Sequence, residues 1–221
     1  AQDGLATFEP AYADELDVIM RWGFSYMQRD GSDTQSEENW LRDEKGGSLY
    51  LRLSTLPQEQ PTRTITHSLA QEIIAGGYWL RPPTSSTNVV IAYAGVVAPE
   101  VIRAVGLLAE DIRDVAVMAV TSADRLNAGW QAAERARQRG DSAAQSHVEK
   151  LLTSVSRDTG MVTITDGHPA TLSWLGGVSG HRTKSLGVEH FGQAGTVDDI
   201  YHLHGLDANA IMHAARALQS G

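Results

Sequence analysis

The sequence predicts an α/β protein with a mostly parallel sheet and helices on both faces. Three stretches, residues 88–94, 115–120 and 161–165, are nearly continuous apolar runs, which is typical of strands buried on both faces. Each is followed by a stretch with helical character, and this alternation indicates parallel strands joined by helical crossovers. With 221 residues, 42% of them apolar, the chain can bury such a core.

The N-terminal part offers fewer elements. Residues 12–27 carry apolar side chains at helical spacing and predict an amphipathic helix. Residues 28–47, which include Asp43, are polar and acidic and predict an exposed loop. Residues 49–55 alternate with a period of two and predict a strand with one buried face, and residues 66–75 predict a second helix. Because these few elements cannot close a hydrophobic core alone, we expect a partner to complete that core.

A proline-rich joint, Arg81-Pro82-Pro83-Thr84-Ser85-Ser86, separates this part from the rest. Consecutive prolines neither extend a helix nor fit a central strand. We therefore divide the chain into residues 1–81, which end in the linker, and residues 82–221. The second part is expected to contain the three apolar strands and a fourth strand at residues 185–188. Helices are expected at residues 98–109, 125–139, 143–152, 169–175, 197–204 and 207–218.

Composition and missing motifs argue against several classes of function. The net charge is −9 and no cluster of Lys and Arg is present, which argues against binding a nucleic acid. No apolar run approaches the roughly 20 residues that span a bilayer, so we expect no membrane association and a cytoplasmic protein. The chain has no cysteine for a thiolate metal site. Glycine-rich motifs for dinucleotides or nucleoside triphosphates and the serine hydrolase motif are also absent.

Histidines are the candidate catalytic groups. His168, in Asp166-Gly167-His168-Pro169, and His190 each follow a predicted strand, where α/β sheets place their ligand-binding loops. Either imidazole could act as a general acid or base. A plainer interpretation is favoured for both: a turn that starts a helix around His168, and a single backbone hydrogen bond for His190. His202 and His204 diverge around a helix, and we predict no metal site.

Several segments resemble one enzyme family in the order in which they occur. Residues 12–27 and 49–55 look like the end of the pyrimidine-binding domain in the homodimeric pyruvate dehydrogenase decarboxylating component, a transketolase-type enzyme. Residues 115–126 resemble that family's strand-to-helix junction in the C-terminal domain. Residues 187–196 are similar to its G-x-x-x-F-G-x-x-x-T loop, in which we expect Phe191 to be buried and His190 to stay exposed.

This resemblance implies a domain organisation and a chemistry. Residues 1–81 would be the tail of a pyrimidine-binding domain with its linker, and residues 82–221 a transketolase-like C-terminal domain. The parent enzyme would be an oxidoreductase that decarboxylates a 2-oxo acid on thiamine diphosphate with Mg²⁺ and passes the acyl group to a lipoyl acyltransferase. The family's Gly-Asp-Gly diphosphate motif is not in these residues, and its activating glutamate would lie upstream of Ala1. We therefore expect no cofactor and no metal to bind this chain alone.

One departure from the family concerns its active-site histidine. In the family the loop after the strand equivalent to residues 49–55 carries that histidine, whereas this chain has Pro57-Gln58-Glu59-Gln60-Pro61. His67 lies six residues beyond Pro61 and is a third candidate, which would replace that histidine if the loop folded back. This departure puts pyruvate in doubt as the substrate.

Our expectation is therefore a C-terminal portion of a pyruvate dehydrogenase-like enzyme that contributes to dimerisation and partner docking without a complete active site. The expected partners are a second copy in a homodimer, the upstream domains and the lipoyl acyltransferase. Three alternatives stay open: a free-standing, non-catalytic assembly or binding domain of the same fold, transketolase proper, and a small independent α/β enzyme that uses His168 or His190.

Overall fold

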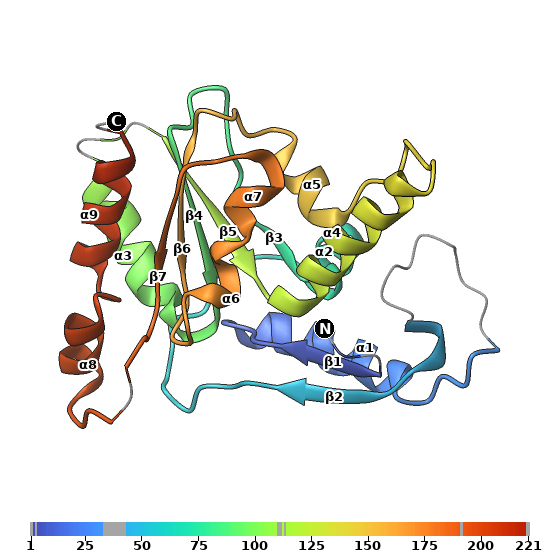
Figure 1. Cartoon of the computed structure of the whole chain (residues 1–221). Coiled ribbons are helices and arrows are strands. Elements are labelled where there is room, and N and C mark those ends of the chain that lie inside the picture. Colours follow the sequence, from blue (N-terminus) through green and yellow to red (C-terminus); the bar gives the residue numbers. More distant parts are fainter. Residues whose placement is uncertain are drawn as a thin grey trace. The chain divides into compact units, whose positions relative to one another are not determined.

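The computed structural model describes residues 2, 4–32, 43–109, 112, 114–190 and 192–219 (Figure 1). The chain forms two compact units. Unit 1 comprises Ala1–Tyr78 together with Val120–Leu151, and unit 2 comprises Trp79–Ala119 together with Leu152–Gly221. No helix in the described part of the chain is long and apolar enough to cross a membrane.

The larger sheet has five strands in the order β3-β5-β4-β6-β7. Its β4–β6 and β6–β7 pairs are parallel, with Val89 opposite Gly160 and Met161 opposite Thr183. Every residue of β4, β5 and β6 is buried, as in a sheet covered on both faces. These findings confirm the predicted fold class. The strands are β3 (Gly77–Arg81), β4 (Val89–Ala94), β5 (Val115–Val120), β6 (Gly160–Ile164) and β7 (Thr183–Leu186).

Helices cover both faces of the β4-β6-β7 part of this sheet in unit 2. The helices α3 (Ala98–Leu108) and α9 (Ala208–Gln219) pack against each other on one face, and α6 (Ala170–Ser173) and α7 (Leu175–Ser179) lie on the other (Figure 1). The carboxylate of Glu100 in α3 accepts a hydrogen bond from the N–H of Ala208, 2.9 Å away, and so caps the first turn of α9. The short helix α8 (Val197–His204) precedes α9 and has no buried residue.

Unit 1 contains a separate sheet of two parallel strands, β1 (Leu5–Phe8) and β2 (Ser48–Leu51), with Leu5 opposite Ser48. The helix α1 (Ala13–Tyr26) packs against α2 (His67–Ala75), and α4 (Ala123–Gln138) contacts β1. The remaining elements are the 3-10 turn η1 (Asp43–Lys45), the 3-10 turn η2 (Gly95–Val97) in unit 2, and α5 (His147–Leu152), which belongs to unit 1 except for Leu152.

The predicted elements differ from the observed ones mainly in short segments. The strand expected at residues 49–55 ends at Leu51, and the helix expected at 143–152 begins at His147. Strands β1 and β3 and helix α7 were not predicted. The exposed loop predicted for residues 28–47 is wrong at Asp43, which is 5% exposed; residues 33–42 of that segment lie outside the described residues. The domain boundary after residue 81 stays a prediction.

Candidate functional site

The loops that follow β6 and β7 lie side by side in unit 2. The carbonyl of Gly167 accepts a hydrogen bond from the N–H of Val188 at 2.8 Å. A Cβ atom at Gly187 would lie 2.6 Å from the oxygen of Gly167 and 2.7 Å from Cδ of Pro169, so only glycine fits at this contact. Because the two strands are parallel, their carboxyl ends share one edge of the sheet, where α/β proteins bind ligands.

His168 lies on the first of these loops and its side chain is exposed. Its Nδ1 accepts a hydrogen bond from the N–H of Ala170, the first residue of α6, at 3.2 Å. A nitrogen that accepts carries no proton, so a neutral ring holds its proton on Nε2. The hydroxyl of Thr165 accepts a further bond from the N–H of Gly167 at 3.2 Å. These contacts belong to a turn that starts α6, as in the plainer interpretation of His168. They leave Nε2 of the ring at the surface.

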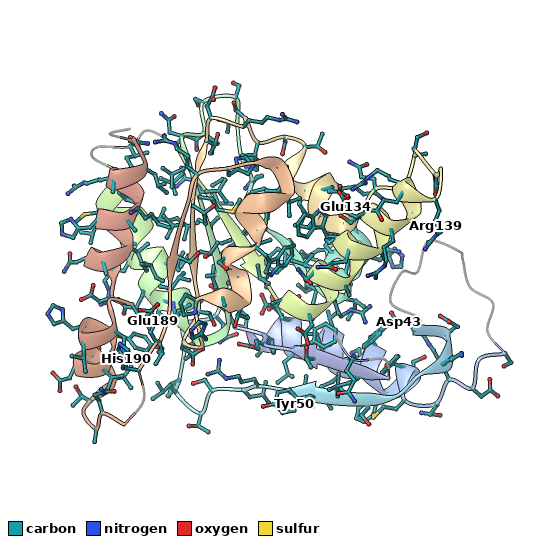
Figure 2. All side chains as sticks on the ribbon, in the orientation of Figure 1. Asp43, Tyr50, Glu134, Arg139, Glu189 and His190 are labelled. Atoms are coloured by element: carbon teal, nitrogen blue, oxygen red, sulfur yellow. The ribbon has the colours of Figure 1, made fainter. Side chains whose placement is uncertain are left out.

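His190 lies on the second loop, beside Glu189, and both side chains are exposed (Figure 2). The exposure of His190 agrees with our expectation, whereas Phe191 lies outside the described residues. Gly192 has a φ of 108°, a left-handed backbone conformation that other residues resist. The loop ends where the hydroxyl of Thr196 accepts a hydrogen bond from the N–H of Asp199 at 3.2 Å and starts α8.

His67 is the first residue of α2 in unit 1, and its side chain is exposed. The loops that carry His168 and His190 thus share one sheet edge, whereas His67 belongs to the other unit. Within the described ranges, no three His, Asp or Glu side chains gather as metal ligands.

Unit 1 contains a buried polar cluster that the sequence did not reveal. The carboxylate of Glu15 accepts hydrogen bonds from the N–H of Ala11 at 2.7 Å, the N–H of Tyr12 at 3.1 Å and the hydroxyl of Tyr78 at 2.5 Å. Burial raises the pKa of Glu15, and these hydrogen bonds and nearby Arg63 oppose that rise. Burial, together with the charge of Glu15, also raises the pKa of the Tyr78 hydroxyl. These hydrogen bonds supply the buried carboxylate with three donors, as a buried polar group requires.

Arg63 connects this cluster to the segment that precedes α2. Its guanidinium donates to both oxygens of Asp14, at 2.6 and 2.8 Å, and to the hydroxyl of Tyr78 at 2.7 Å. The same group lies 5.3 Å from the ring centre of Tyr12 and 5.0 Å from that of Tyr78. These contacts fix the chain between β2 and α2 against the start of α1.

A second buried cluster surrounds Arg125 in α4. Its guanidinium donates to both oxygens of Asp43, at 3.0 and 2.6 Å, and its Nε donates to the carbonyl of Ile74 at 2.7 Å. It also lies 4.7 Å from the ring centre of Trp22 and 5.6 Å from that of Phe8. The side chains of both partners of the ion pair are 7% exposed. The sequence signal around Arg125 indicated only the start of a helix.

Comparison with known proteins identifies the family. A model described as the transketolase-like TK C-terminal domain matches residues 76–207, more than half of the chain. The chain belongs to this family. This match confirms the resemblance to transketolase-like enzymes that the sequence analysis noted. No curated protein sequence matches the chain significantly.

Solved transketolases share the fold. The transketolase from Leishmania mexicana is 12% identical, with a TM-score of 0.66 over 98% of this chain and 25% of that chain. A Pichia stipitis transketolase in complex with sedoheptulose-7-phosphate is 15% identical, with a TM-score of 0.60 over the same shares. A split-gene transketolase, an inactive β4 tetramer, is 17% identical, with a TM-score of 0.59 over 98% of this chain and 58% of that chain. This transketolase-like chain therefore spans a quarter of the length of the first two.

Proposed function

We propose that this chain is the C-terminal portion of a thiamine diphosphate-dependent 2-oxo acid dehydrogenase of the pyruvate dehydrogenase type. Its own task is assembly, through dimerisation and the docking of partners such as a lipoyl acyltransferase. The observation that carries this proposal is the transketolase-like family match over residues 76–207. The chain also aligns with only 25% of the length of the Leishmania mexicana transketolase. Residues 1–81 would supply the tail of the pyrimidine-binding domain, and residues 82–221 the C-terminal domain.

Exposed apolar side chains in unit 1 support an assembly role. Five large apolar residues of this unit are between 44% and 55% exposed: Phe24, Met27, Tyr50, Leu53 and Leu56. Unit 2 has four more exposed large apolar residues, Ile102, Leu107, Val197 and Leu203, and such side chains become interaction sites where they form a contiguous patch. In the proposed enzyme the cofactor supplies the carbanion chemistry when it is bound. The Gly-Asp-Gly motif that the resemblance implies does not occur in these residues, so we assign cofactor binding to the rest of the enzyme.

A second candidate is a separate subunit of a transketolase-type enzyme. Two observations favour it: the chain covers 58% of a split-gene transketolase, and Pro61 stands where the pyruvate dehydrogenase-like pattern has its histidine. In that case the substrates would be sugar phosphates. The inactive tetramer of that solved protein also supports a third possibility, a chain that assembles with itself and catalyses nothing alone.

The first test concerns the cofactor. Titration calorimetry of the 221-residue chain with thiamine diphosphate and Mg²⁺ should show no binding at micromolar concentrations, because the diphosphate motif is absent. Micromolar binding by the chain alone would contradict the proposal.

The second part of the test separates the two substrate classes. The chain should be combined with the polypeptide that carries the Gly-Asp-Gly motif of the same enzyme. Reduction of an artificial electron acceptor with pyruvate or another 2-oxo acid would support the dehydrogenase. Transfer of a two-carbon unit between sugar phosphates, without oxidation, would support the transketolase subunit instead.

A further inference from the structure

We propose that His181 is an acid-sensitive latch in unit 2: its neutral ring holds the turn before β6 against the start of β7, and protonation of the ring releases that turn. The residue lies between α7 and β7, at the opposite end of β7 from the loop that carries His190. The inference is independent of the proposed function, because it concerns a buried titratable group outside the candidate site. It gives unit 2 a conformational response to mild acid.

The ring of His181 is buried and forms a single hydrogen bond. The residue is 7% exposed, and its Nδ1 lies 3.1 Å from the carbonyl oxygen of Thr159, the residue just before β6. A carbonyl can only accept, so Nδ1 carries the proton of the neutral ring and Nε2 has a bare lone pair. Among the described residues, this buried Nε2 has no hydrogen-bond partner. The bond to Thr159 is therefore the contact that the neutral form of the ring provides.

The backbone around His181 is fixed to α7 and β7. Its N–H donates to the carbonyl of Gly176 in α7 at 2.9 Å. Its own carbonyl accepts a hydrogen bond from the hydroxyl of Thr183, the first residue of β7, at 3.1 Å. The two elements are closely packed here, since a Cβ atom at Gly176 would collide with Oγ1 of Thr183. The ring thus projects from a rigid junction, and the turn before β6 is the part that it holds.

The turn at residues 156–159 leads directly into the ladder between β6 and β7. The N–H of Thr159 donates to the carbonyl of Ser156 at 3.0 Å, and its hydroxyl donates to the carbonyl of Thr87 at 3.2 Å. Two residues later, the N–H of Met161 donates to the carbonyl of Arg182 at 2.9 Å. The ring of His181 therefore joins the two strands where their pairing begins.

A proton on Nε2 is unfavourable at this position. Burial disfavours the charged ring, and the positive charge of Arg157 repels it. The carbonyls of Thr159 and Arg157 partly oppose these effects, but the pKa of His181 still lies below its ordinary value. An added proton on Nε2 would also find no acceptor within hydrogen-bond distance among the described residues.

The surrounding charged groups give a protonated ring no counter-charge in contact. Residues 84–88, β6, α6 and α7 have no charged side chain. Besides Arg157, the charged or titratable side chains of the turn, of β7 and its first flanking residue, and of α9 are Asp158, Arg182, Lys184, His213 and Arg216. Neither ring nitrogen bonds to a carboxylate in the described part of the chain. We therefore expect the protonated ring to leave its buried position, which breaks the bond to Thr159.

The first test compares the pH dependence of stability in the full chain and in His181→Asn. An asparagine amide places an N–H near the position of Nδ1 and does not titrate. Because the pKa of His181 is lowered in the folded chain, its stabilising effect is complete above about pH 6.5 and is lost as the pH falls below that value. Relative to His181→Asn, the unfolding equilibrium constant of the natural chain should rise by up to about tenfold per pH unit below pH 6.5.

Urea denaturation between pH 8 and pH 5 measures this ratio. His213→Asn, at an exposed position of α9, is the matched control and should keep the pH profile of the natural chain. Identical pH profiles of the natural chain and His181→Asn would overturn the proposal. NMR of the natural chain with ¹⁵N-labelled histidine needs no variant: it should show a proton on Nδ1 at pH 8 and a titration midpoint below 6.5. A proton on Nε2, or a midpoint at or above 6.5, would also overturn it.

Hydrogen exchange distinguishes a local latch from a general loss of stability. Protection factors correct for the pH dependence of exchange itself. Between pH 7.5 and pH 5.5 the amide of Met161 should lose up to about tenfold in protection, because its bond lies beside the released turn. The amide of Ile211, which bonds within the first turn of α9, should keep its protection, and in His181→Asn both amides should keep theirs. Equal losses at Met161 and Ile211, or no loss at Met161, would show that His181 is not a latch.

Discussion

Arg125 shows how a single residue organises unit 1. Its guanidinium is paired with Asp43, bonds to the carbonyl of Ile74 and lies over the rings of Trp22 and Phe8. Burying two charges costs solvation free energy, so such a pair persists only when further hydrogen bonds satisfy the remaining donors. Here Nε, which does not reach Asp43, bonds to Ile74, so one arginine connects η1, α1, α2 and α4.

The first residue-scale prediction concerns this ion pair. Asp43→Ala should lower the free energy of unfolding by about 3 to 5 kcal/mol, because it leaves the guanidinium of Arg125 buried without its counter-charge. The matched control is Asp17→Ala, which breaks the exposed pair with Arg21 and should leave the free energy of unfolding almost unchanged. Urea denaturation of both variants measures the difference. Equal and small losses would show that solvent reaches Arg125.

These residue contacts explain what the sequence could not show about the candidate site. Asp43 and Arg125 are 82 positions apart, and Glu15 and Tyr78 are 63 apart. A local pattern contains no information about such pairs, and the acidic composition of residues 28–47 even suggested that Asp43 was exposed. The positions of His168 and His190 on loops after strands were predictable, because a strand, a turn and a helix start each have a local signature.

At the scale of elements, the buried strands were the most predictable part of the fold. The strands β4, β5 and β6 are apolar throughout, and the sequence located them to within one or two residues. The short strands β1 and β3 have no comparable pattern, since they have only four and five residues. Helix α8 has the expected period, but Val197 is 42% exposed and no residue of the helix is buried. The periodicity of apolar residues predicts that a segment is a helix, but it does not show which part of the protein packs against that helix.

The element-scale prediction concerns the contact between the β6 and β7 loops. Gly187→Ala should destabilise unit 2 by about 1 to 3 kcal/mol, because the added methyl group overlaps backbone atoms of Gly167 and Pro169. Gly106→Ala in α3 is the matched control in the same unit: its Cβ meets no atom within 4 Å, and alanine favours a helix by about 0.5 to 1 kcal/mol. Thermal melts should therefore shift in opposite directions. A silent Gly187→Ala would mean that the loops separate easily.

At the scale of the whole molecule, each of the two compact units is built from two separate segments of the chain, so a single cut at the proline joint does not separate them. Unit 1 combines the first 78 residues with residues 120–151, so its second segment is encoded between two segments of unit 2. From the sequence we expected residues 82–221 to form the C-terminal domain, because four predicted strands and their helices lie there. The contacts of α4 change what such a fragment is expected to do.

A fragment of residues 84–221 should keep part of its structure and lose α4. The start of α4 is fixed by contacts with residues before position 84: Arg125 with Asp43, Asp124 with Thr7, and the hydroxyl of Thr121 with the carbonyl of Ile73. Without them the arginine has no buried partner, and an isolated helix of 16 residues is marginal in water. The strands β4, β6 and β7 and the helices α3 and α9 keep their contacts with one another.

Hydrogen exchange with mass spectrometry should therefore show protected peptides from these elements and rapid exchange over residues 123–138, in contrast to the full chain. Equal protection of α4 in both proteins would show that the helix belongs to the C-terminal domain after all.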